Sequence, residues 1–180
     1  MRSKTDLKFF IASSLALKDQ RQAVKDSVAA LDAMGFPFAF SYYDYNEHTV
    51  QRYEEEGAQE SVNLEWIPKC PFFVLIFDKQ VKTNSLSEFN EAIRQFEKNR
   101  FPRNIFVFYN KAYEKEADEF IKRHASHLAL SEDNEFVKRN NIFGYPYESA
   151  EEISDKIIGQ VKVLMDNHDM PLVNAVHTSN

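Results

Sequence analysis

The stretch Phe72-Phe73-Val74-Leu75-Ile76-Phe77 is apolar at every position, so both of its faces must be buried. That pattern is typical of a central strand in a parallel sheet, because helices cover both faces of such a sheet. Ile105–Tyr109 repeats the pattern, and shorter apolar runs occur at Leu7–Ala12, Phe36–Tyr42 and Ile142–Tyr147. The last contains Pro146, which favours an edge position. We therefore predict five strands.

Longer segments with apolar residues at helical spacing separate these runs. They span Leu15–Met34, Asn46–Trp66, Ser85–Asn99, Tyr113–Leu128 and Ser149–Met165. Strand–helix alternation predicts a parallel sheet with helices on both faces. Right-handed crossovers favour the flavodoxin-like strand order 2-1-3-4-5. We expect one α/β domain over residues 1–166, and a tail or the start of a linker over residues 167–180.

Composition and charge limit the classes of partner. The chain has 180 residues, about one domain, and a net charge of −6. That sign argues against direct nucleic-acid binding, which needs a basic face. Cys70 is the single cysteine, so no internal disulfide can form, as in a reducing compartment. No apolar run approaches the ~18 residues of a membrane span, and no signal peptide is recognisable. We expect a cytoplasmic protein that does not enter a membrane.

In a sheet of this order, ligands bind at the carboxyl ends of the strands, where the order reverses between strands one and three. The stretches at that point are Ala12-Ser13-Ser14, Tyr43-Asp44-Tyr45 and Asp78–Glu88. Ser13 and Ser14 have two compatible interpretations: a helix N-cap, or a polar turn that contacts a phosphate or ribose. Neither a Rossmann nor a P-loop fingerprint is present.

Glu88 also has two interpretations. Ser85 and Glu88 have the S-x-x-E spacing of a capping box, which needs no catalytic role. The switch-point rule, however, places the first turn of this helix at the ligand site, where a carboxylate could contact a sugar. Spacing alone favours the capping box, and location favours a functional carboxylate.

Asp44 lies between Tyr43 and Tyr45, directly after the second strand. A turn aspartate is common there; the functional alternative is a hydrogen bond to a ligand hydroxyl, with tyrosine rings stacked on a base. Cys70 is interpreted as a buried apolar residue. The five histidines show no zinc-binding spacing, so no metal site is expected.

Three motifs in order and at matching spacing resemble a known family. They are Phe9-Phe10-Ile11-Ala12-Ser13-Ser14 followed by Leu17-Lys18 and Arg21; Phe73–Phe77 followed by Ser87-Glu88-Phe89-Asn90-Glu91-Ala92; and Pro102 followed by Ile105–Tyr109. Together they cover residues 7–166 and resemble a bacterial TIR-domain subgroup of antiphage effectors that cleave NAD+ at the nicotinamide–ribose bond.

The resemblance implies that Glu88 is the catalytic glutamate and that Ala12, Ser13 and Ser14 border the substrate. It places Asp44 near a loop that changes shape on activation. Many such domains carry a Trp about one turn before the glutamate, whereas this chain has Asn84 there. Tyr43 or Phe77 is therefore the candidate partner for the nicotinamide ring.

The resemblance further implies that NAD+ is a substrate rather than a cofactor, and that TIR–TIR self-association activates the enzyme. A sensor domain or partner for a nucleotide signal is also expected. The product is either linear or cyclic ADP-ribose. Two alternatives stay open: a nucleoside 2-deoxyribosyltransferase-like enzyme, which also uses a helix-borne Glu on an N-glycosidic bond, and a non-catalytic TIR interaction module.

Overall fold

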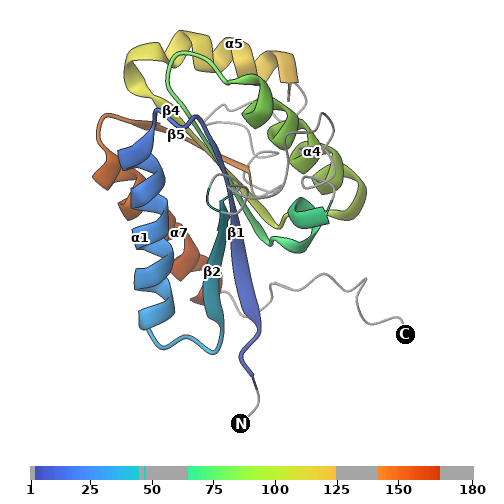
Figure 1. The fold of residues 1–180 in the computed structure, drawn as a ribbon, viewed down its shortest axis with the longest axis vertical. Helices are drawn as coiled ribbons and strands as arrows, with labels where there is room; N and C mark the ends of the chain where they lie inside the picture. The colour runs from blue at the N-terminus through green and yellow to red at the C-terminus, as the bar shows by residue number, and fades with distance from the viewer. Residues whose placement is uncertain (1–2, 45–46, 48–64, 125–141, 167–180) are drawn as a thin grey trace.

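The computed structural model describes residues 3–44, 47, 65–124 and 142–166. Within them, five parallel strands form one sheet in the order β2-β1-β3-β4-β5 (Figure 1). The strands are β1 (Asp6–Ser13), β2 (Ala39–Asp44), β3 (Phe72–Phe77), β4 (Asn104–Asn110) and β5 (Ile142–Tyr147). This order confirms the prediction of a flavodoxin-like α/β fold, and β3 lies at the centre of the sheet.

Helices cover both faces of the sheet. α1 (Lys18–Ala33) and α7 (Ala150–Asp166) lie on one face, and α4 (Thr83–Asn99) and α5 (Glu114–His124) lie on the other (Figure 1). Two short 3-10 turns, η1 (Ile67–Lys69) and η2 (Lys111–Tyr113), precede β3 and α5. No helix in the described ranges is long and apolar enough to cross a membrane.

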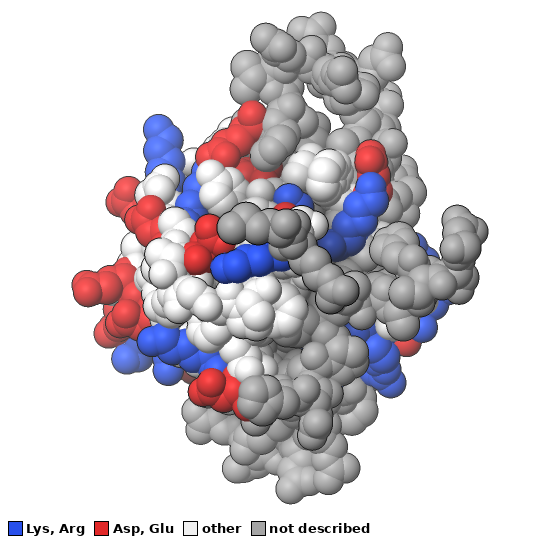
Figure 2. Space-filling view, turned by 90° about the horizontal axis from the view of Figure 1, so that it is seen from below, with Lys and Arg blue, Asp and Glu red and all other residues white. Residues whose placement is uncertain are grey.

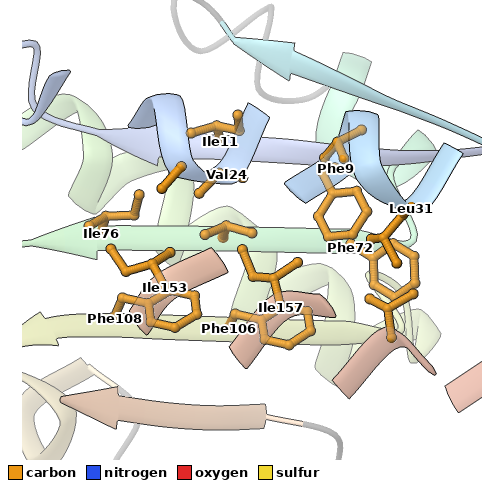
Figure 3. Packing of buried hydrophobic residues seen from close by; sticks show 14 of the residues in the cluster. Phe9, Ile11, Val24, Leu31, Phe72, Ile76, Phe106, Phe108, Ile153 and Ile157 are labelled. Atoms are coloured by element: carbon orange, nitrogen blue, oxygen red, sulfur yellow. The ribbon is translucent and has the colours of Figure 1, made fainter. Parts of the chain in front are cut away.

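The alternation of side chains along each strand divides the core into two layers. Beneath α1 and α7, Val24 and Ile157 approach Ile11, Ile76 and Phe106 of the sheet (Figure 3). The second layer lies beneath α4 and α5, and Phe73 and Phe89 there are fully buried. Every side chain of β3 is buried, as its unbroken apolar sequence predicts.

Several predicted boundaries were wrong. β2 begins at Ala39 rather than Phe36, because Pro37 has no N–H to donate to the sheet. α1 begins at Lys18 rather than Leu15, because Ser14 to Leu17 form a turn closed by a 3.1 Å hydrogen bond from Leu17 N to Ser14 O. Gly35 follows the C-cap residue Met34 of α1 and has φ of +78°, the left-handed conformation in which a glycine commonly ends a helix.

Some predictions fall on residues that the structure does not describe. They include most of the predicted helix over Asn46–Trp66, the end of the predicted helix over Tyr113–Leu128, and the whole of the predicted tail over residues 167–180. Trp66 itself is described and immediately precedes η1.

Candidate functional site

A pocket of about 230 Å³ lies at the carboxyl ends of β1 and β3. Ser14 and Leu17 contribute one wall from the β1–α1 turn, and Phe77, Lys79 and Lys82 contribute another from the β3–α4 connection. Ser85, in the first turn of α4, completes the lining. This is the place where the reversal of strand order predicts a ligand site.

Ser13 and Ser14 do not cap α1, contrary to one prediction. The N-cap position is Leu17, which makes no side-chain cap hydrogen bond. Ser14 Oγ instead accepts a 3.3 Å hydrogen bond from Ala16 N, and Ser13 Oγ donates a 3.5 Å bond to Ser14 O. The serines therefore shape the turn before the helix. Ser14 lines the pocket, whereas Ala12 is fully buried in the core.

The capping box at Ser85 and Glu88 is also absent. α4 begins two residues earlier than predicted, at Thr83, so Lys82 is the N-cap and Ser85 is the third residue of the helix. Lys82 makes no side-chain cap bond. Because Ser85 and Glu88 are three residues apart in the helix, they share one face of α4, and both side chains are buried.

Glu88 lies about one helical turn beyond Ser85 and is 4% exposed. Ser85 lines the pocket, whereas Glu88 is not among the residues that line it. The next acidic residue of the helix, Glu91, bonds to Arg94 at 2.7 Å and to Gln95 at 2.8 Å. Burial alone would raise the pKa of Glu91, but these hydrogen bonds outweigh it and lower the pKa below 4.5.

Asp44 is the last residue of β2 rather than a turn residue, and it is completely buried. Its carboxylate accepts a hydrogen bond from Arg21 of α1 and lies 3.0 Å from Lys25 Nζ. Lys25 also pairs with Glu47. Burial opposes the charged form of Lys25, but the bonds to Glu47 and Asp44 outweigh it, so the pKa of Lys25 is raised above 10.5.

The two aromatic candidates lie in different places. Tyr43 is 4% exposed and is stacked between Phe10 and Trp66, with ring centroids 5.3 and 4.8 Å away. It does not line the pocket. Phe77 does line the pocket, and the centroid of its ring lies 5.2 Å from that of Phe120.

Sequence reasoning did not single out Lys79 and Lys82, the two cations of the pocket lining. Both lie in the stretch Asp78–Glu88 that the switch-point rule selects, so the signal was their charge within that stretch. Sequence reasoning also did not single out the pairing of Arg21 and Lys25 with Asp44. The helical spacing of the two cations, four residues apart on α1, was the available signal.

Other reactive groups of the described residues lie away from this chemistry. Cys70 is fully buried, as predicted, and burial raises the pKa of its thiol to about 12. A thiol with so high a pKa is a poor nucleophile. No cluster of three His, Cys, Asp or Glu side chains suited to a metal occurs in the part of the chain that the structure describes.

Figure 2 shows the end of the molecule from which the strands start, and on that face Lys and Arg are interspersed with Asp and Glu. The described side chains on it form no continuous basic surface.

The fold and the pocket together define an α/β protein with a flavodoxin-like sheet and a pocket at its topological switch point. No protein-family model and no curated protein matches the sequence.

Among solved structures, the chain is similar to apo translation elongation factor SelB from Methanococcus maripaludis, with a TM-score of 0.48 and 10% identity. That match covers 93% of this chain but 36% of SelB, so the chain spans about a third of that protein. It is also similar to an oxidoreductase from Corynebacterium diphtheriae, with a TM-score of 0.44, 10% identity and coverage of 98% and 100%. Similarities this weak carry no inference about activity.

Proposed function

We propose that the protein is an NAD+ nucleosidase that cleaves the nicotinamide–ribose bond, with Glu88 as the catalytic carboxylate. The observation that carries the proposal is the place of Glu88: a carboxylate that is 4% exposed, one helical turn beyond Ser85, which lines the pocket at the switch point of the sheet. The resemblance of the three sequence motifs to NAD+-cleaving TIR domains supports it.

The chemistry requires little more than one carboxylate. Nicotinamide leaves the ribose with the bonding electron pair, so the positive charge passes from the pyridinium ring to an oxocarbenium-like sugar. A carboxylate in a site shielded from water stabilises that cation strongly. Water then attacks the sugar carbon and loses a proton, which gives linear ADP-ribose; attack by a nitrogen of the adenine gives a cyclic product instead.

The pocket has groups suited to the rest of the dinucleotide. Lys79 and Lys82 supply positive charge for a pyrophosphate against one acidic lining residue, Asp78, and α4 begins at the pocket without a side-chain cap. The free N–H groups at such a helix start favour an anion. Phe77 offers the aromatic surface in the pocket lining, so it is a better candidate than Tyr43 for contact with nicotinamide.

The size of the pocket supports activation by self-association. Its volume of about 230 Å³ lies below the ~300–1,000 Å³ of typical ligand sites, so it suits part of a dinucleotide. A second copy of the chain would complete the site. By this proposal the enzyme acts in the cytoplasm in antiphage defence, and a sensor domain or partner that responds to a nucleotide signal assembles it.

The test is to incubate purified protein with NAD+ over nanomolar to tens of micromolar protein and to separate the products by chromatography. Wild type should release nicotinamide, with specific activity rising with concentration as protomers associate. Glu88→Gln should lower the rate at least a hundredfold, because the neutral amide cannot stabilise the cation, a loss of about 2.7 kcal/mol.

Glu91→Gln is the matched control, with the same substitution one turn further along α4, and it should keep wild-type activity. Thermal melts exclude unfolding of either variant. Full activity of folded Glu88→Gln would refute the role of Glu88. Activity on deoxynucleosides but not on NAD+ would support the transferase alternative. Inactivity toward both, with a cellular effect that survives Glu88→Gln, would support the interaction module.

A further inference from the structure

The β1–α1 turn forms one wall of the pocket, and the helix that follows it has no side-chain cap. Ser14, Ala16 and Leu17 line the pocket, and Leu17 is the N-cap residue without a cap hydrogen bond. A helix start that lacks a cap leaves N–H groups without partners and frays readily. The turn has two hydrogen bonds of its own, and Leu17 packs against the core; contacts further along the helix add to these in setting its place.

A buried ion pair lies one turn beyond this start. Arg21 N donates a 3.0 Å hydrogen bond to Leu17 O, which joins the ion-paired residue directly to the N-cap. The side chain of Arg21 bonds to Asp44, and both side chains are at least nine-tenths buried. Asp44 lies opposite Ile11 in the register of β1 and β2, so the pair is two residues before the end of β1.

A buried ion pair of this kind adds little net stability to a fold, because its charges lose their hydration. Arg21 Nε is buried and has no hydrogen-bond partner among the described residues, so the guanidinium is only partly satisfied. Buried ion pairs can often be replaced by apolar side chains with no loss of stability. In some proteins a buried ion pair serves instead to specify one arrangement of the elements that it joins.

α1 is also joined to β2 at its other end. There Asp32 Oδ1 accepts a 2.9 Å hydrogen bond from Phe40 N, about three turns from Arg21 and far from the pocket. The Arg21–Asp44 ion pair and the Asp32–Phe40 hydrogen bond both join α1 to β2, and only the ion pair lies next to the pocket wall. This gives a comparison within one helix.

We infer that Arg21 and Asp44 are positioning residues, which fix the Ser14–Leu17 wall of the pocket by anchoring the uncapped start of α1 to β2. Neither lines the pocket, so they act through the backbone of the wall. The catalytic measurement below rests on the proposed function, whereas the exchange measurement does not.

The test compares wild type with Arg21→Met/Asp44→Asn, a double variant that removes one positive and one negative charge and leaves Lys25 with Glu47. Hydrogen exchange is followed in peptides covering residues 14–21, where the amides of Ala16, Leu17 and Arg21 are bonded within the wall. Exchange there should be at least tenfold faster in the double variant, at a melting temperature within a few degrees of wild type. NAD+ turnover should fall at least tenfold in kcat/KM.

Asp32→Ala is the control at the other end of α1. It should speed exchange near residue 40 and leave both the 14–21 peptides and NAD+ turnover unchanged. If the double variant shows wild-type exchange over residues 14–21, or if Asp32→Ala speeds exchange there equally, the inference is wrong. If wild type cleaves no NAD+, the proposed function fails, and the exchange measurement still decides whether the ion pair positions the wall.

Discussion

α1 and α4 both begin at the pocket, yet different contacts fix their first turns. α1 follows β1 and is anchored by charge, through Arg21, Lys25 and the fully buried Asp44. α4 follows β3, and its first two turns turn Ser85, Glu88 and Phe89 toward the interior. Neither helix has the serine cap that its sequence predicts. The comparison shows that a helix start at a ligand site can depend on tertiary contacts instead of a local cap.

Removing the charge that anchors α1 should have the largest effect on stability. Asp44→Ala leaves the cation of Arg21 buried without its carboxylate and leaves Lys25 with Glu47 alone, which should lower the free energy of unfolding by about 3–5 kcal/mol. Urea unfolding followed by circular dichroism measures this. Glu91→Ala, which breaks the partly exposed pair with Arg94 on α4, should lower it by about 0–1 kcal/mol. Equal losses in the two variants would mean that burial of the ion pair does not matter.

A new cap should distinguish the two helix starts. Lys82 has extended backbone angles, φ −72° and ψ 156°, which are those of a normal N-cap. Lys82→Ser should therefore raise the free energy of unfolding by about 0.5–2 kcal/mol. Leu17 has φ −91° and ψ 55° and contacts the core, so Leu17→Ser should lower stability instead.

Ser85→Ala provides the complementary control in the same unfolding measurement. Removal of a capping serine lowers the free energy of unfolding by about 1 kcal/mol. Because Ser85 is the third residue of the helix, Ser85→Ala should lower it by less. If Ser85→Ala lowers the free energy of unfolding by the full amount expected of a cap, and Lys82→Ser does not raise it, the observed start of α4 is contradicted.

Alkaline pH should weaken the anchor of α1 by a smaller amount. The folded pKa of Lys25 is raised, so its contribution to stability is fully present below about 10.5 and is lost as the pH rises through the folded pKa. The pKa of nearby Tyr42 is also raised, in its case by burial, so its ionisation adds to the loss of stability at high pH.

Lys25→Arg isolates the lysine, because arginine stays protonated throughout this range. Melting temperatures of wild type and variant, compared between pH 9 and 11.5, should diverge above about pH 10.5, with the variant retaining more of its stability. Parallel curves would show that Lys25 does not contribute to the alkaline loss.

The sequence by itself determined the fold. Strands that are buried on both faces need apolar residues at every position, so Phe72–Phe77 could be assigned to the centre of a parallel sheet without a structure. The strand order and the place of the pocket then followed from general rules of connection. A glycine at position 35 suits the end of α1, because few other residues adopt its positive φ.

Only the tertiary structure decided how the residues around the pocket are used. Ser14 and Ser85 are of a residue type that often caps helices, but α1 begins after Ser14 and α4 begins before Ser85. Asp44 has the sequence context of a turn, and only the approach of α1 to β2 shows that it is buried with Arg21 and Lys25. Local sequence fixes backbone preferences, which are short-ranged. Ion pairs and pockets join residues far apart in the chain, so they appear only when the elements are assembled.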